Sequence, residues 1–468
     1  MSSYRGQYAL PSSRLPDASE GSVLKRPVPI SSRRSKRQAS RTDRVGRKAA
    51  VAQTSLKLFL AIRAILCALG LSFFPAAFVG SLWLVPAFAA VASVGWFLLE
   101  GRRAGPKQLA LVAVILAAYF VPSIIPCSTG DGFCPQRLVE QEIYLLAVGL
   151  LLYVCGYIAA DRTDGIDRYI FGAALGLYIA IAVVVLITRD NLTRDIEPPF
   201  IPLLIERNDL ALLVAWMFFV CALFRTLVGS RLAGILAFLI VVAVAAVVSL
   251  ATQSRLVAVI SVLGVLFFAR IEHRVPSSWW IGLSILVACF LAVEYQSVER
   301  LVRRAVLAEG VTSISSRVYL WKSGWDMFLN APWFGHGLGG FAELFDTYRH
   351  AAPIEPGIDV RFTPWPHNVP IEILVEKGIA GLTAFLALLA LVLANLKDKP
   401  RENFKEVRRA AGFLLLTLII VGLLDSTTKR IWYLPSLLYV LGMSAGISQK
   451  RDSFSSGDAV NEKALSKS

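Results

Sequence analysis

His367 occupies a position that suits chemistry at a membrane surface. It is followed by Asn368, by Pro370 and by an apolar run that continues to Leu396. Because asparagine is a good N-cap and proline is tolerated in a first turn, we predict that a membrane helix begins directly after this histidine. The positive end of the helix dipole disfavours an imidazolium, so we expect a neutral ring that can accept a proton. The sequence therefore predicts a general base, with a structural interfacial histidine as the alternative.

Several arginines are expected on the same face as this histidine. Arg317 lies in the long loop that ends on it, and Arg255 follows another apolar span. Guanidinium groups bind phosphate oxygens bidentately and keep their charge, so arginines that converge at a membrane surface suit a lipid diphosphate. Salt bridging is the alternative, because residues 296–366 hold seven basic and seven acidic side chains. Further candidates for substrate binding are Arg207, Arg303 and Arg304.

A glycine-rich segment lies between these arginines and the histidine. Residues 332–341 contain four glycines around His336, and glycine backbones can approach phosphate closely. The segment lacks the Lys-Ser/Thr pair of a nucleotide-binding loop. We therefore favour a tight turn between two interfacial helices, with His336 as a secondary candidate for substrate binding.

Two glutamates follow the histidine. Glu372 and Glu376 are spaced by one helical turn, so they either orient His367 or pair with Lys377 and the arginines. We count Asn368 and Glu372 among the substrate-binding candidates.

Other kinds of catalytic chemistry have little support. The four histidines give no two-ligand helical spacing, and no Asp-Xaa-Asp or Gly-Xaa-Ser-Xaa-Gly motif occurs. A neutral histidine with arginines in place of a metal predicts a transfer onto a hydroxyl that needs neither a metal nor a cofactor.

The composition places these residues in a polytopic membrane protein. The mean hydropathy is +0.60, and 56% of the 468 residues are hydrophobic while 17% are charged. Apolar stretches long enough to cross roughly 30 Å of hydrocarbon predict an all-α protein with about twelve spans. These spans begin near Leu56, Ala76, Leu109, Gln141, Tyr169, Leu210, Leu232, Leu256, Trp279, Val369, Ala410 and Trp432.

Basic loops orient the predicted spans, because Lys and Arg resist translocation. With about twelve spans, the basic clusters fall on the side of both termini, so we predict cytoplasmic termini and an active face on the other side. The predicted division is a basic N-terminal segment (1–50), nine helices (51–295), a periplasmic catalytic loop with short helices (296–367), three helices (368–448) and a cytoplasmic tail (449–468).

Much of the net charge of +15 lies at the N-terminus, where residues 1–48 hold twelve basic and three acidic side chains. This segment is rich in Ser, Arg and Pro and has no apolar periodicity. We interpret it as a disordered segment that sets the membrane topology. The alternative is that it binds anionic membrane lipids. We expect no nucleic-acid partner.

Cys127 and Cys134 share one short outer loop whose two glycines allow a tight reversal. If that face is an oxidising periplasm, the two thiols could form a disulfide with a structural role. Two separate thiols are the alternative.

At these residues the chain resembles the bacterial O-antigen ligase and O-antigen polymerase superfamily. The resemblance extends over residues 200–445. It rests on Ser316-Arg317 through Trp321, Gly335-His336-Gly337, His367-Asn368 with Glu372, Gly378 and Gly381-Leu382, and more loosely Ser254-Arg255. It implies a GT-C-like glycosyltransferase that needs no metal and acts on glycans linked to undecaprenyl diphosphate, at the periplasmic face of the inner membrane.

The resemblance also implies roles for single residues. His367 resembles the base that deprotonates the acceptor hydroxyl, and Arg255 and Arg317 resemble the arginines that hold the diphosphate. In-line attack would invert the anomeric centre. His336 departs from the family pattern, which leaves open which histidine is essential.

Three functions remain open. An O-antigen ligase, which joins polysaccharide to lipid A-core, is narrowly favoured over a polymerase of O-antigen, capsule or exopolysaccharide repeats. A lipid-linked glycan flippase or other transporter would also use a basic cavity, but it predicts ionisable residues near the middle of spans. A non-catalytic scaffold would tolerate the loss of His367.

Overall fold

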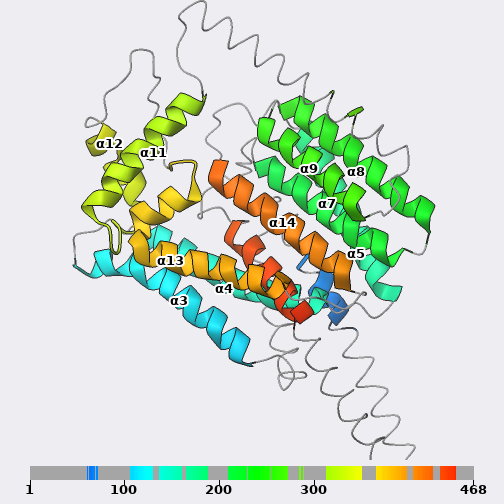
Figure 1. Ribbon diagram of the computed structural model, residues 1–468, viewed down its shortest axis with the longest axis horizontal. Helices are drawn as coiled ribbons and strands as arrows, with labels where there is room; N and C mark the ends of the chain where they lie inside the picture. The colour runs from blue at the N-terminus through cyan, green and yellow to red at the C-terminus, as the bar shows by residue number, and fades with distance from the viewer. Residues whose placement is uncertain are drawn as a thin grey trace, which may run out of the picture. The chain divides into compact units, whose positions relative to one another are not determined.

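The computed structural model describes residues 106–129, 136–160, 165–187, 209–271 without 229 and 253, 313–349, 365–397, 404–424 and 433–448, with a few residues between 61 and 71 and between 284 and 288 (Figure 1). The chain divides into two compact units, Met1–Leu58 and Phe59–Ser468, and every described residue belongs to the second.

The described residues form helices and turns, with no strand among them, so the predicted all-α class is confirmed. Within the described residues, six helices are long and apolar enough to cross a membrane, and three shorter apolar helices accompany them. All nine coincide with predicted spans, whereas the spans predicted near Leu56, Ala76 and Trp279 fall wholly or largely outside the described residues. The labelled helices are α3 (Pro106–Thr129), α4 (Gln136–Ala159), α5 (Gly165–Ile187), α7 (Asp209–Leu227), α8 (Arg231–Thr252), α9 (Arg255–Ile271), α11 (Ser313–Asn330), α12 (Gly340–Arg349), α13 (Val369–Lys397) and α14 (Lys405–Leu424).

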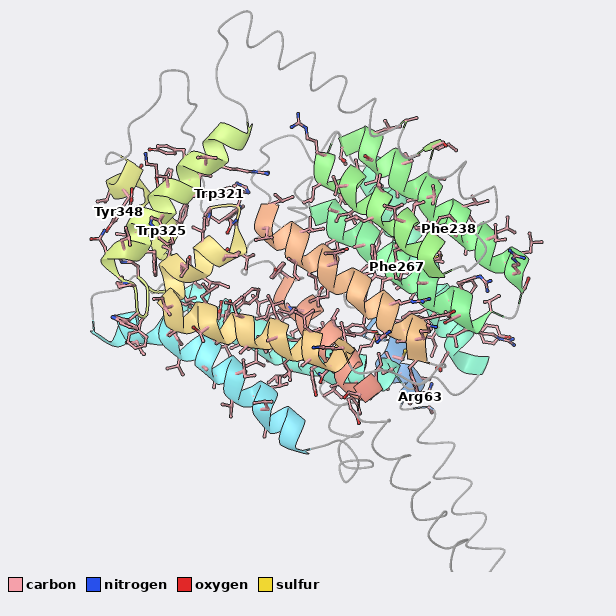
Figure 2. The ribbon with its side chains drawn as sticks, viewed as in Figure 1. Arg63, Phe238, Phe267, Trp321, Trp325 and Tyr348 are labelled. Carbon is pink, nitrogen blue, oxygen red and sulfur yellow. The ribbon has the colours of Figure 1, made fainter. Side chains whose placement is uncertain are left out.

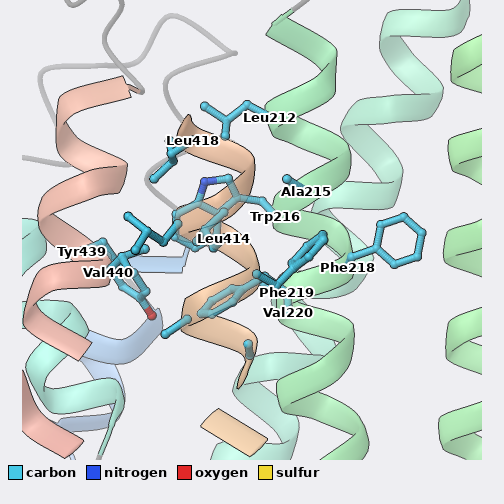
Figure 3. Close-up of a cluster of buried hydrophobic side chains, with 14 of the residues drawn as sticks. Leu212, Ala215, Trp216, Phe218, Phe219, Val220, Leu414, Leu418, Tyr439 and Val440 are labelled. Carbon is cyan, nitrogen blue, oxygen red and sulfur yellow. The ribbon is translucent and has the colours of Figure 1, made fainter. Parts of the chain in front are cut away.

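Helix α7 forms the centre of one group of helices. Its residues 210–223 are all buried, because α5, α8, α9 and α14 pack around it. Trp216 stacks on Tyr178 and meets Phe219 and Tyr439 edge-on (Figure 3). Its Nε1 donates to Ser436 Oγ at 3.4 Å, which satisfies the indole N–H inside an apolar core.

The last apolar helix, Tyr433–Ser448, packs very closely on α4. A Cβ added at Gly442 would lie 1.8 Å from the carbonyl oxygen of Tyr153. Small residues of this kind let helix backbones approach each other where no hydrophobic force drives helices together.

Arg63, a charged residue within an apolar stretch, is buried and paired. It bonds to Asp167 in the first turn of α5, and Figure 2 labels its position. A charge in an apolar bundle is expected to have such a partner.

The second group of helices is built on α13, which packs against α3, α11, α12 and α14. A separate small core forms between α11, α12 and the beginning of α13. Its buried members are Tyr319, Leu320, Met327, Phe341, Phe345 and Val375. This core fixes α11 and α12 on the segment that follows His367.

Candidate functional site

Asn368 caps α13 and ties it to the end of α14. Its Oδ1 accepts a hydrogen bond from the Ile371 N–H at 3.0 Å, as an N-cap does. Its Nδ2 donates at 2.9 Å to the carbonyl of Leu423, which lies in the last turn of α14. Carbonyls in a last turn have no partner within the helix, so this bond satisfies one of them. Both ends of the Asn368 amide are therefore engaged in joining two helix ends.

His367 has a left-handed backbone conformation, with φ of 53°, and is the one non-glycine residue with positive φ in the described part of the chain. This region costs an L-residue roughly 1–2 kcal/mol. The residues on either side are held in place, because Trp321 Nε1 donates to the Pro366 carbonyl at 3.0 Å and Asn368 bonds as above. The half-buried ring meets Trp365 edge-on, with centroids 5.9 Å apart. Strained backbone that its surroundings hold in place is a feature of functional sites.

Arg317 lies one helical turn before Trp321 in α11. Residues four apart share a helix face, so the half-buried Arg317 lies on the same face as Trp321. That face contacts the backbone beside His367 through the bond from Trp321 to Pro366. Figure 2 labels Trp321 on the side of α11 toward the start of α13.

Arg255 begins α9 and is exposed. Ser254 caps this helix, because its Oγ accepts from the Val257 N–H at 3.4 Å and its carbonyl from the Ala258 N–H at 3.2 Å. Arg255 is therefore the first side chain beyond a helix N-cap, where the dipole favours anions nearby.

Helix directions place Arg255 and His367 at the same end of their helices. Figure 3 shows Leu418 beside Leu212 and Leu414 beside Trp216, so α14 runs antiparallel to α7. Two short connections join α7 to α8 and α8 to α9, and these packed helices alternate in direction. The start of α9 and the end of α14 therefore lie on one side, and Asn368 brings the His367 loop to that side.

The glycine-rich segment bonds to a break in α13. The helix is interrupted at Gly378, where φ is 63° and ψ is −162°. Four backbone hydrogen bonds to the segment satisfy groups that the break leaves without helical partners. They run from His336 N to Val375 O (2.8 Å), Gly337 N to Glu376 O (3.1 Å), Ile379 N to Pro332 O (2.8 Å) and Ala380 N to Trp333 O (3.2 Å). The apolar run to Leu396 gave no sign of this break, because hydropathy does not register a change in backbone direction.

Two glycines with positive φ allow this contact. A Cβ at Gly335 would lie 2.4 Å from the carbonyl carbon of Glu376, and one at Gly378 would lie 2.4 Å from that of Trp333. Backbone atoms cannot move aside as a flexible side chain can. The segment is a turn between α11 and α12, as favoured from the sequence, and its close approach is to another backbone.

His336 lies in this turn and contacts the end of α11. Its Nε2 lies 2.8 Å from the Met327 carbonyl, and because a carbonyl only accepts, this nitrogen carries the proton. The ring also faces Tyr348, with centroids 6.4 Å apart.

Buried charged groups surround the break. Glu376 Oε1 accepts from the Gly339 N–H at 3.1 Å. Lys377 forms a buried ion pair with Glu142 of α4, and its Nζ lies 4.0 Å from the centroid of the Tyr119 ring in α3. Lys377 therefore joins three helices at the point where α13 changes direction.

Sequence reasoning missed Glu142, which is 235 positions away from Lys377 and had no local signal. Pairing of Lys377 with the nearby Glu372 and Glu376 was one of the two alternatives that the sequence left open. Glu372 is buried, with 1% of its surface exposed, and interacts electrostatically with Tyr433. No sequence pattern connects Glu372 with that tyrosine either.

Some predicted residues lie outside the described part of the chain. They are Arg207, Arg303, Arg304 and Cys134. Cys127 lies in the last turn of α3, but its side chain is also outside the description. The roles of these arginines and the disulfide remain predictions.

The arrangement suits an anion and a proton acceptor side by side. His367 sits before a helix N-terminus, Arg317 lies on the adjacent helix, and Arg255 marks the same end of a third helix. Ring nitrogens can accept a proton, and guanidinium groups can hold phosphate oxygens as negative charge develops on them.

Comparisons with known proteins match the middle of the chain. Residues 238–386 match the family model described as O-antigen ligase. A Rickettsia conorii protein that is provisionally named a polysaccharide ligase is 27% identical over 135 residues. That match covers 28% of this chain and 31% of the relative, so less than a third of the relative's length is spanned.

Proposed function

We propose that this multi-pass membrane protein transfers a glycan from undecaprenyl diphosphate to a sugar hydroxyl, because residues 238–386 match the O-antigen ligase family model and six of the described helices could span a membrane. The observation that carries the proposal is the position of His367, which precedes a capped helix and is linked through Pro366 and Trp321 to the helix that bears Arg317. The reaction takes place at the periplasmic face of the inner membrane and uses no metal.

The proposed step is a single displacement. A ring nitrogen of His367 takes the proton of the acceptor hydroxyl while the hydroxyl oxygen bonds to the anomeric carbon. The bond from that carbon to the diphosphate oxygen breaks, and its electron pair leaves on the diphosphate. Attack from the face opposite the leaving group inverts the anomeric centre.

Arg317 and Arg255 stabilise the leaving group in this proposal. Charge develops on the diphosphate as the glycosidic bond breaks, and positioned cations lower the energy of that state more than that of the bound donor. Arg207, Arg303 and Arg304 are proposed to add to this binding. Glu372 and Asn368, which the sequence suggested as substrate-binding residues, are instead proposed to hold the start of α13, which agrees with the burial of both side chains and with the two hydrogen bonds of Asn368.

The proposed topology has about twelve spans with both termini in the cytoplasm. In it, residues 51–295 and 368–448 span the membrane, and residues 296–367 form the catalytic loop. The basic segment 1–50 and the tail 449–468 stay in the cytoplasm. The basic segment lies near anionic membrane lipids.

We favour lipid A-core as the acceptor, which makes the protein an O-antigen ligase. The relative that is provisionally named a polysaccharide ligase supports this choice over a polymerase of O-antigen, capsule or exopolysaccharide repeats. A flippase is less well supported. It would need charged groups in an open cavity, whereas the ion pair of Lys377 and Glu142 is buried between α13 and α4.

The test is complementation of a deletion strain with the wild type, His367→Ala, Arg317→Ala or His336→Ala at equal membrane abundance. Loss of a general base lowers the rate by about 100-fold or more, so polymer-bearing lipopolysaccharide should vanish with His367→Ala. Lipid-linked polymer should accumulate with a ligase, and single repeats with a polymerase. His336→Ala should retain activity, since its ring bonds to the end of α11. Full activity of both His367→Ala and Arg317→Ala would exclude the catalytic proposal.

A further inference from the structure

One face of α11 exposes large apolar side chains. Val318, Trp325 and Leu329 are all at least half exposed, and their spacing of seven and four places them on one side of the helix. Lys322, also exposed, lies on the same side and is long enough to carry its charge to the edge of an apolar layer. The opposite side of α11 is buried in the small core with α12. The exposed side is therefore not needed for the packing of this helix.

The turn after α11 continues this surface. Trp333 is 68% exposed and Phe334 is also exposed. We define the α11 apolar face as Val318, Trp325, Leu329, Trp333 and Phe334. Contiguous aromatic and aliphatic surface of this kind marks an interaction site rather than ordinary protein surface.

Two backbone hydrogen bonds fix the position of the α11 apolar face along the axis of α13. The carbonyls of Pro332 and Trp333 accept from the N–H groups of Ile379 and Ala380, directly after the break. Trp333 therefore lies level with the first residue of the straight part of α13.

That straight part has the length and surface of a membrane span. Residues 379–397 rise about 28 Å as an α-helix, close to the roughly 30 Å of a hydrocarbon core. Ile379, Leu386 and Leu393 are exposed at intervals of seven, so they form one apolar stripe of the kind that a membrane span turns to lipid, called here the lipid-facing stripe. The stripe begins where Trp333 is bonded, and tryptophan is enriched at this boundary of a bilayer.

We propose that the α11 apolar face docks on the bilayer, with Trp333, Phe334 and Trp325 in the boundary between headgroups and hydrocarbon. Continuity with the lipid-facing stripe of α13 favours lipid over a protein partner. The sequence predicted a periplasmic loop over residues 296–367 with interfacial helices around the turn at His336, and in this proposal α11 is such a helix, with its apolar face in the bilayer surface. Arg317, next to Val318 and half-buried, is then held at the level of lipid phosphates.

The inference stands apart from the transferase proposal, and its test reads lipid contact without any reaction. A fluorescent amino acid replaces Trp333, or in a second variant Trp325, in the full-length protein. The protein is reconstituted in vesicles of phosphatidylethanolamine and phosphatidylglycerol. Quenching by lipids with a nitroxide near the headgroup is compared with quenching by aqueous iodide. The matched control is the same probe at Glu343, an exposed polar position on α12.

We expect the lipid nitroxide to quench positions 333 and 325 at least threefold more than iodide does, with the opposite order at position 343. Quenching by iodide at 333 and 325 as strong as at 343 would mean that the face meets water. Protection from both quenchers would mean that protein covers it, either another part of this chain or a second copy. Either of these results overturns the proposal. If one labelled variant does not fold, as judged by its thermal unfolding, the other decides.

Discussion

Trp321 donates a hydrogen bond through Nε1 to the carbonyl of Pro366, over a distance of 3.0 Å. The bond connects two positions 45 residues apart, α11 and the residue before His367. It holds one side of a backbone that is strained at His367. A side chain of α11 therefore helps to set where the proposed base stands.

Removing this donor should slow transfer without unfolding the protein. Trp321→Phe keeps a ring but loses the N–H, and a net hydrogen bond is worth about 1 kcal/mol, or roughly a fivefold change in rate. Steady-state kinetics in proteoliposomes should show a lower kcat with little change in KM. Trp325→Phe, one turn later on the same helix, is the control: it also replaces an indole by a phenyl ring but keeps the α11 apolar face apolar, so it should match the wild type. Equal kinetics of all three proteins would separate Trp321 from the reaction.

Asn368 should show two separable effects. Asn368→Ser keeps an oxygen that can cap α13 but loses the donor to Leu423, whereas Asn368→Ala loses both. Because a cap is worth about 1 kcal/mol, the alanine variant should melt at a lower temperature than the serine variant. Both should lose transfer activity if the link to α14 positions His367. A serine variant with normal activity would show that the link is dispensable.

Gly378→Ala should disrupt the break in α13. The added Cβ would lie 2.4 Å from the Trp333 backbone, and the positive φ with an extended ψ is essentially restricted to glycine. We expect a loss of stability of at least about 3 kcal/mol and little folded protein in the membrane. Gly412→Ala in α14 has open space around it and should be neutral or stabilising, by up to about 1 kcal/mol. Fluorescence size-exclusion profiles after heating would rank the two variants, and equal profiles would contradict the contact.

Removing one partner of the ion pair between Lys377 and Glu142 should lower the stability of the protein more than removing both. Lys377→Met leaves a buried carboxylate without its cation and should cost about 3–5 kcal/mol. The double variant with Glu142→Leu removes both charges and should recover much of that loss. Thermal unfolding in detergent of the wild type, both single variants and the double variant measures the coupling. Additive losses would show that the two charges do not interact.

Local patterns predicted much of the fold. Apolar stretches placed nine helices, and the Asn-Val-Pro sequence after His367 predicted the N-cap that Asn368 forms. Glycine density predicted a turn around His336. Each of these signals lies within a few residues of the element that it describes.

The rest depends on contacts between distant residues. The break at Gly378 is stabilised by backbone hydrogen bonds from residues 332–333 and 336–337. No sequence pattern around Gly378 predicts these bonds. Glycine is common in membrane helices, so it did not argue for an interruption there. Glu142, Trp321 and Leu423 gained their roles only through tertiary packing.

The break in α13 also bears on how the site can open. Four backbone bonds join the turn after α11 to both sides of Gly378, so we expect α11, the turn and the start of α13 to move as one body. His367 and Arg317 both belong to that body and keep their spacing. Arg255 belongs to the helices around α7, and the body meets these helices through the Asn368–Leu423 bond and the packing of α13 on α14. We therefore expect a bulky glycan to enter by a hinge motion between Arg255 and the other two residues, and closure to bring both arginines to the diphosphate and the neutral His367 ring to the acceptor hydroxyl.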